Sequence, residues 1–154
     1  MKSRFSPELL ARLSDVRRSL EPYFGPDTAY PGTRSERPSA GHCAIVSAIA
    51  ALTVGGALAS TTVNGVNHWF NRLSDGKQLW DVDLTGDQFD LEVVQVAPVG
   101  KLYPRTANES FAALNVETLQ RALTLARRGG MAGTVVQLDQ LLSARLAQVL
   151  TAES

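Results

Sequence analysis

Residues 41–52 read Gly-His-Cys-Ala-Ile-Val-Ser-Ala-Ile-Ala-Ala-Leu, and the rest of the chain is interpreted around this stretch. A small-residue turn precedes Cys43, the only cysteine of the protein, and an apolar run follows it. From Ala44 to about Thr53 nearly every residue is small or branched and apolar, which predicts a helix packed on most of its sides. Gly55-Gly56 ends this helix in the manner of a glycine cap. The sequence therefore predicts a buried helix with a lone cysteine at its start.

Downstream of this helix, two short turns predict an antiparallel meander. Asn64-Gly65 is a strong hairpin dipeptide, and residues 74–77, Ser-Asp-Gly-Lys, form a second tight turn. The segments around the turns contain branched and aromatic residues in alternation. The predicted strands cover residues 57–63, 66–73, 78–84 and 91–96. We therefore expect an α+β fold in which the helix that carries Cys43 packs on a small antiparallel sheet.

Three further helices are predicted from capping and spacing. Ser6-Pro7 begins the first, whose leucine stripe runs to Leu20, and its polar side is expected to be a solvated face made of Arg12, Asp15, Arg17 and Arg18. Asn115 caps the second, which ends at Gly129-Gly130. The third covers about residues 134–150. It is expected to pack on its own domain, with a dimer contact as the alternative.

Residues 25–41 connect the first helix to Cys43 and are rich in proline, glycine and hydroxyl residues. Such a composition cannot continue as a helix or an inner strand, so a long ordered loop is expected. A loop beside a candidate nucleophile can form one wall of a cleft or can be a passive connector. Both interpretations stay open on sequence alone.

The bulk composition limits the classes of protein to consider. The 154 residues predict a single domain, 1–154, with a sizeable core. Fifteen basic residues balance fifteen acidic ones, so neither nucleic acid nor an anionic membrane is an expected partner. The N-terminus lacks the pattern of a signal peptide, and the most apolar window, residues 44–59, is short for a bilayer span. We expect a cytoplasmic protein, monomeric or homodimeric, without a cofactor.

Cys43, His68 and Asp83 form the candidate catalytic constellation. A thiol attacks as thiolate, which a helix N-terminus and a neighbouring imidazole favour. With a hairpin centred on Asp75-Gly76, opposing residue numbers sum to about 151, and 68 and 83 have that sum. We therefore expect His68 and Asp83 to lie on one face of adjacent strands, where the carboxylate would fix the imidazole tautomer.

Several neighbouring residues offer alternatives for these roles. Asp81 points to the same face as Asp83 and competes for the orienting role, and His42 competes with His68 as base. Asp87 is expected to be a loop cap. A zinc site built from Cys43, His42, His68 and Asp83 is possible by ligand type, but its spacing matches no standard structural motif, so no metal ligand is predicted. Asn67 and Asn71, on either side of His68, are expected to satisfy backbone groups at the strand edge, although either can position a substrate. Trp69 and Trp80 are expected in the core or the cleft wall.

The chain resembles the YunG-like family of small bacterial proteins over about residues 9–128. The resemblance is carried by the segments Gly41-His42-Cys43-Ala44, Gly55-Gly56, Asn67-His68-Trp69-Phe70-Asn71, Asp83-Leu84-Thr85, Gln88-Phe89, Arg105, Asn115-Val116-Glu117-Thr118, Arg121 and Leu125. The terminal helix lies outside it. This resemblance constrains the fold more than the activity.

More broadly, a Cys at a helix start, a His on a strand and an Asp on the next strand are similar to the papain-like and transglutaminase-like superfamily. That similarity implies a nucleophile at Cys43, a base at His68 and an orienting acid at Asp83. Asn67, Trp69 and Gln88 are the residues that we expect to bind the substrate. No glutamine precedes the cysteine to complete a papain-type oxyanion hole. We therefore expect a cysteine-dependent acyl-transfer enzyme (peptidase, amidase, deamidase or transglutaminase-like) acting on a peptide or another amide-containing substrate. A non-catalytic binding module and a metal-dependent hydrolase are the alternatives.

Overall fold

The computed structural model describes residues 4–33, 37, 39–89 and 93–153. Within these residues the chain has an α+β fold with four α-helices and one five-stranded antiparallel sheet. The helices are α1 (Pro7–Leu20), α2 (Cys43–Val54), α3 (Val116–Arg128) and α4 (Ala132–Glu153). The strands are β1 (Ala57–Val63), β2 (Val66–Ser74), β3 (Leu79–Asp83), β4 (Gln95–Pro98) and β5 (Ala107–Glu109). Short 3₁₀ helices lie at η1 (Glu21–Tyr23), η2 (Gly86–Phe89) and η3 (Phe111–Ala113).

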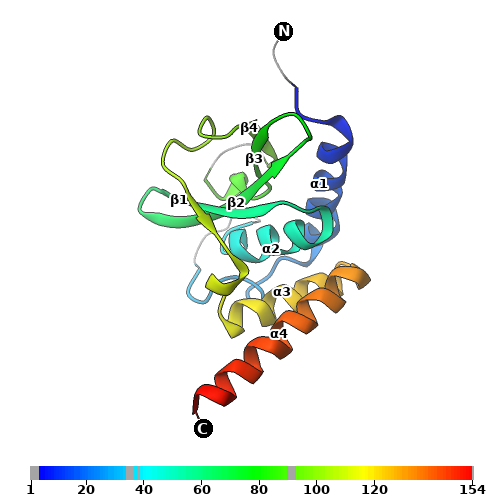
Figure 1. Ribbon diagram of the computed structural model, residues 1–154, viewed down its shortest axis with the longest axis vertical. Coiled ribbons are helices and arrows are strands. Elements are labelled where there is room, and N and C mark those ends of the chain that lie inside the picture. The colour runs from blue at the N-terminus through cyan, green and yellow to red at the C-terminus, as the bar shows by residue number, and fades with distance from the viewer. Residues whose placement is uncertain (1–3, 34–36, 38, 90–92, 154) are drawn as a thin grey trace.

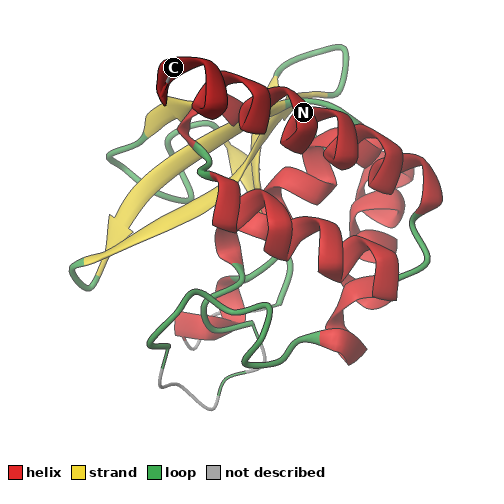
Figure 2. Ribbon diagram, turned by 90° about the horizontal axis from the view of Figure 1, so that it is seen from below, coloured by secondary structure: helices red, strands yellow, loops and turns green. Residues whose placement is uncertain are grey.

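The sheet and the helices form separate layers, and α2 is the helix that lies between the sheet and α3 (Figure 1). The strand order is β4-β3-β2-β1-β5, so β2 occupies the centre. Figure 1 shows α2 directly beneath β2, with α3 and then α4 on the side of α2 away from the sheet. Turned by 90°, the helices gather on one side of the molecule and the strands on the other (Figure 2). This arrangement places the start of α2 close to the central strand.

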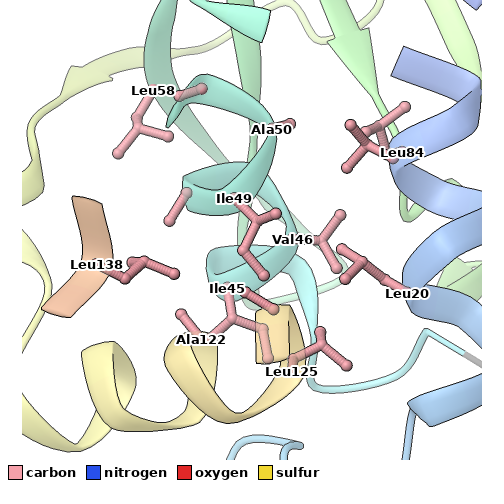
Figure 3. Close-up of a cluster of buried hydrophobic side chains, with 14 of the residues drawn as sticks. Leu20, Ile45, Val46, Ile49, Ala50, Leu58, Leu84, Ala122, Leu125 and Leu138 are labelled. Atoms are coloured by element: carbon pink, nitrogen blue, oxygen red, sulfur yellow. The ribbon is translucent and has the colours of Figure 1, made fainter. Parts of the chain in front are cut away.

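The main hydrophobic core surrounds α2, as its apolar sequence predicts. Ile45, Val46 and Ile49 are at most 1% exposed, and only Cys43 and Ala44 of the first two turns of α2 are half-buried. Figure 3 shows these side chains meeting Leu20 of α1, Leu125 of α3 and neighbours from the strands and α4. Burying a leucine or isoleucine side chain contributes about 1.5–3 kcal/mol. Contacts of this kind on all sides fix the position of α2, and with it the position of Cys43.

The central strand β2 divides its side chains between two faces of the sheet. Trp69 and Leu73 pack against the helical core, and Asn71 donates from Nδ2 to the carbonyl of Ser47 in α2 at 2.9 Å. Phe70 belongs to a second apolar cluster with Tyr103. His68, two residues away from Phe70, is fully buried and its ring also meets Tyr103, edge to face at 5.7 Å between centroids.

The predicted pairing of β2 with β3 is wrong by two residues. The observed pairs are Asn71 with Val82 and Arg72 with Asp81, so opposing numbers sum to 153 rather than 151. The cause is the turn, where the backbone N–H of Asp75 donates to the carbonyl of Gln78 and the loop centre moves to Gly76-Lys77. The carboxylate of Asp75 accepts from the N–H groups of residues 77 and 78 and fixes this shifted loop.

Other element boundaries also differ from the prediction. The strand predicted at residues 91–96 is observed as β4, Gln95–Pro98, and residues 91–92 lie outside the described residues. β5 was not predicted, because a three-residue strand has no periodicity of its own and depends on pairing with β1. α4 is longer than predicted at both ends. None of the helices in the described part of the chain is long and apolar enough to cross a bilayer.

The face predicted to be solvated on α1 is wrong at Arg17. Its side chain is 2% exposed and donates to the carbonyl of Leu84 at 2.8 Å and to both carboxylate oxygens of Asp87 at 2.8 and 2.9 Å. Burial opposes ionisation of Asp87, but hydrogen bonds from Arg17 and Ser39 hold the pKa of this carboxyl below its usual value. Asp87 is thus an internal ion-pair partner that ties α1 to the segment after β3.

Candidate functional site

Cys43 is the first residue of α2, at a helix start without a side-chain cap. Ser6 caps α1 and Asn115 caps α3, each accepting from a first-turn N–H, whereas His42 makes no such bond at α2. The first N–H groups of α2 are therefore available to stabilise negative charge. Gly41, with φ +77°, turns the chain into the helix, and a Cβ there would lie 2.5 Å from Oγ1 of Thr33. The glycine lets the preceding loop pass close beside the cysteine.

His68 is held from one side by Asp83. Its Nε2 lies 2.6 Å from Oδ2 of the carboxylate, and both side chains are completely buried. A carboxylate only accepts hydrogen bonds, so Nε2 carries the proton of this bond. The sequence prediction that these two residues meet is therefore correct, although the strand register that suggested it is not.

The other nitrogen of His68 faces Gln88 and Cys43. Nε2 of Gln88 lies 3.1 Å from Nδ1 of His68 and also 3.1 Å from the carbonyl oxygen of Thr85, which orients the amide with its NH₂ toward the ring. The thiol of Cys43 hydrogen-bonds to the same imidazole. Burial lowers the pKa of His68, but the hydrogen bonds with Asp83 and Cys43 outweigh it and raise the pKa to about 9.

Asp83 is fixed by donors from two further residues, Thr85 and Tyr103. The backbone N–H of Thr85 donates to Oδ1 at 2.9 Å, and the hydroxyl of Tyr103 donates to Oδ2, the oxygen that also faces His68. Burial and the charge of Asp83 raise the pKa of Tyr103, which keeps this hydroxyl a donor. Tyr103 could not be predicted as a site residue, since a tyrosine in an irregular segment has no spacing that relates it to a strand twenty residues earlier.

The competing candidates have other partners. Asp81 pairs with Arg72, with N–O distances of 2.7 and 3.1 Å. The ring nitrogens of His42 lie 2.8 Å from Oγ1 of Thr28 and 2.9 Å from the carbonyl oxygen of Ala40, and burial lowers the pKa of His42. Within the residues that the structure describes, no group of three or more His, Cys, Asp or Glu side chains is placed to hold a metal ion.

Cys43 opens onto a cavity of about 650 Å³. The predicted substrate-binding residues Asn67, Trp69 and Gln88 all line it. Loop residues Tyr30 and Thr33 form another part of the wall, so the loop before Cys43 does contribute to a cleft. The remaining lining comes from the start of α2, the first residue of β2 and the start of α3: Ala40, Gly41, Ala44, Ile45, Val66, Ala113, Leu114, Asn115, Thr118 and Arg121.

Comparison with known proteins identifies one relationship. Neither the curated proteins nor the solved structures yield a match. The family model described as YunG protein matches residues 12–126, which include most of α1, the whole of α2 and of the sheet, and most of α3. This segment contains Cys43, His68 and Asp83 together with all the residues that line the cavity. Because the match extends over well more than half of the sequence, the chain belongs to the YunG family.

Proposed function

We propose that the protein is a cysteine-dependent acyl-transfer enzyme that acts on an amide, thioester or isopeptide bond. The observation that carries this proposal is the chain of contacts from Cys43 through His68 to Asp83, with the thiol at an open cavity. A nucleophile, a base and a group that orients the base are the three parts such a site needs.

In the proposed reaction, the thiol proton of Cys43 passes to Nδ1 of His68, whose raised pKa favours the imidazolium, and the resulting thiolate attacks the carbonyl carbon of the substrate. Collapse of the tetrahedral intermediate breaks the bond to the leaving amine or thiol, which takes the proton from His68. A thioester between Cys43 and the acyl group remains. Water or an acceptor amine then attacks it, His68 accepts a proton from this nucleophile, and the proton returns to the departing Cys43 sulfur.

Asp83 supports the base through Nε2 of His68. Its carboxylate stabilises the imidazolium that forms when Nδ1 accepts the thiol proton, in keeping with the raised pKa of His68. Thr85 and Tyr103 keep the carboxylate in this orientation. Neither residue reaches the reacting atoms in this scheme, so both are positioning residues.

For the oxyanion we propose Gln88 and the uncapped N-terminus of α2 as donors. The side-chain amide of Gln88 lies on the cavity wall beside Nδ1 of His68, and the first N–H groups of α2 lack a side-chain cap. Donors fixed by the fold stabilise the developing charge without reorganisation. The site thus has a glutamine donor five residues after its acid, in place of one before its cysteine.

We further propose that the fold is a compact relative of the papain-like and transglutaminase-like superfamily. The support is the shared order of a cysteine at a helix start, a histidine on a strand and an acid on the adjacent strand. A thiol that must stay reduced suits a reducing compartment, so we also propose a cytoplasmic location.

A binding module with the same fold but no catalysis is the alternative function. It anticipates a cleft filled by side chains, or a cysteine out of reach of the histidine. The cavity is open and the thiol hydrogen-bonds to His68, and both features support the catalytic proposal instead.

The test is the second-order rate of alkylation by iodoacetamide at pH 7, read by intact mass. Cys43 is the only thiol, so all labelling reports on it. We expect wild type to react about 10-fold or more faster than N-acetylcysteine amide, and Cys43→Ala to show no labelling. Asp83→Asn should slow the reaction, whereas the matched control Asp81→Asn on the same strand should not. A wild-type rate equal to that of the free thiol would contradict the proposal.

A further inference from the structure

The electrostatics of the cavity favour a negatively charged ligand. The starts of α2 and α3 both line the cavity, and helix N-termini carry partial positive charge. Among the described residues that line it, Arg121 has the only permanent charge, and no acidic side chain is found there. Glu117, in the first turn of α3, is exposed and is not part of the lining.

Arg121 lies on α3, and one of its N–H donors has no hydrogen-bond partner within the described residues. Its Nη2 donates to Oγ1 of Thr118 at 3.2 Å, and its guanidinium stacks on the ring of Tyr30 at 5.8 Å from the centroid. Its Nε is buried and has no hydrogen-bond partner. Within the described residues, no carboxylate lies within 4.0 Å of this guanidinium, although Arg17, Arg72 and Arg128 each pair with one.

The position of Arg121 is fixed by the fold. Thr118, its acceptor, lies one turn earlier on α3 and is itself buried, and Tyr30 comes from the loop that leads to Cys43. Arginine presents a planar fork of N–H donors that matches a carboxylate. A cation held in place at a largely apolar cavity therefore provides a binding position for one carboxylate.

From this geometry we infer that the substrate carries a carboxylate group that Arg121 binds while Cys43 meets the scissile carbonyl. The inference rests on the proposed function, because it assigns the substrate class of the same site. The expected substrates are amides or thioesters of acidic compounds, such as acyl groups or leaving amines that bear a free carboxylate.

Three pairs of probes test this inference. Each is a chloroacetamide that alkylates a thiol with loss of chloride, namely N-chloroacetyl-glycine, N-chloroacetyl-β-alanine and N-chloroacetyl-4-aminobutyrate, each with its uncharged carboxamide. The three spacers bring the carboxylate to increasing distances from the sulfur. The measured quantity is the ratio of the acid rate to the carboxamide rate at Cys43, divided by the same ratio for N-acetylcysteine amide.

In the wild type we expect this normalised ratio to reach about 10–100 for at least one spacer, as a charge-assisted hydrogen bond provides. Arg121→Gln should bring the normalised ratio to about 1, and its circular dichroism spectrum checks that the variant is folded. Arg121→Lys should keep part of the preference. Arg127→Gln, an exposed arginine of the same helix outside the cavity lining, is the matched control and should retain all of it.

The outcomes separate this inference from the proposed function. A reactive Cys43 with a normalised ratio of 1 for all three spacers would overturn the acidic substrate and leave the acyl-transfer proposal standing. A preference that persists in Arg121→Gln would overturn it as well. The ratio cancels the intrinsic reactivity of the thiol, so a slow Cys43, which contradicts the acyl-transfer proposal, still shows whether Arg121 selects an acid.

Discussion

At the scale of single residues, one carboxylate organises the site. Asp83 accepts from His68, Thr85 and Tyr103, three donors that come from β2, from the turn after β3 and from the segment before β5. A buried carboxylate with several donors is held in one orientation, and its hydrogen bonds in turn restrict the orientation of the side chains that donate to it. The carboxylate therefore holds the imidazole through Nε2, while Nδ1 faces Gln88 and the thiol of Cys43.

Gln88 gives the residue-scale prediction. If its amide stabilises the oxyanion, Gln88→Ala should slow acylation of Cys43 by p-nitrophenyl acetate about 100-fold. Alkylation by iodoacetamide passes through no oxyanion and should change less than about 3-fold, since the effect of a single removed neutral contact is small. Stopped-flow release of p-nitrophenol and intact mass measure the two rates.

Asn67→Ala is the control for Gln88→Ala, because Asn67 also presents a side-chain amide to the cavity. It should leave acetylation by the small ester within about 3-fold of wild type, because the hydrogen bonds described for His68 and Gln88 go to Asp83, to Thr85 and to one another. Equal losses of the two rates in Gln88→Ala would show that the glutamine acts through the position of His68 and not on the oxyanion.

At the scale of elements, the short-range patterns were predictive and the long-range pairings were not. Ser6 and Asn115 cap their helices as their sequence context predicts, and Asn64-Gly65 closes the β1–β2 hairpin. The second hairpin was shifted because the Asp75 side chain stabilises a four-residue loop. Moving the loop centre by one residue changes the sum of paired numbers by two, which preserves the face of every side chain. His68 and Asp83 therefore still meet.

The parts of the site that could not be predicted come from segments with no pattern. Tyr103 follows β4 in an irregular stretch, and Arg17 occupies a polar position of an amphipathic helix, where the spacing alone indicates solvent. Its burial depends on Asp87, seventy residues later, which supplies the opposite charge. Arg121 is similar, since only the tertiary fold brings the middle of α3 to the cysteine.

The connection from α2 to β1 gives the element-scale prediction. Gly55 and Gly56 have φ of +109° and +94°, so alanine is strained at either position, by about 1–3 kcal/mol. At Gly56 a Cβ would also lie 2.6 Å from Cβ of Leu73 and 2.9 Å from the carbonyl oxygen of Arg72, whereas at Gly55 nothing lies within 4 Å. Overpacking adds about 1–3 kcal/mol. We therefore expect Gly56→Ala to destabilise the protein more than Gly55→Ala.

Urea unfolding followed by circular dichroism compares the two glycine variants under one condition. Gly55→Ala measures the backbone strain alone, and the difference between the variants measures the contact with β2. Equal free energies of unfolding would show that β2 yields to the added methyl group. In that case the close approach of this connection to the central strand would not be a constraint on the position of α2.

At the scale of the whole molecule, the helix beyond the family match also supports the cavity. α4 lies outside residues 12–126, yet Arg145 donates to the carbonyl of Leu114 and, at 3.1 Å, to that of Phe111. These carbonyls belong to the turn that leads into α3, and Leu114 lines the cavity. In Figure 1 the C-terminal part of α4 extends away from the layers while its earlier turns lie along α3. α4 therefore stabilises the part of the cavity wall that is formed by the turn before α3.

The pH dependence of global stability gives the final prediction, because the two histidines act in opposite directions. The pKa of His68 is raised to about 9, so protonation favours the folded state. This stabilisation is complete below the ordinary pKa of about 6.5 and is lost as the pH rises toward 9. The pKa of His42 is lowered by burial, so its protonation below about pH 6.5 favours unfolding. Because His68 lowers stability above about pH 6.5 and His42 lowers it below that pH, the free energy of unfolding should be largest near pH 6.5.

Urea titrations from pH 5.5 to 10 measure this profile, and Asp83→Asn isolates the contribution of His68. Without the carboxylate the pKa of His68 falls, since burial then dominates, and the decline of stability between pH 6.5 and 9 should flatten. Asp81→Asn removes an equally buried charge that pairs with Arg72, and it should lower stability at every pH without changing that slope. Parallel profiles for wild type and Asp83→Asn would mean that the contact between His68 and Asp83 does not control the protonation of the imidazole. The base proposed for Cys43 would then lack its orienting charge.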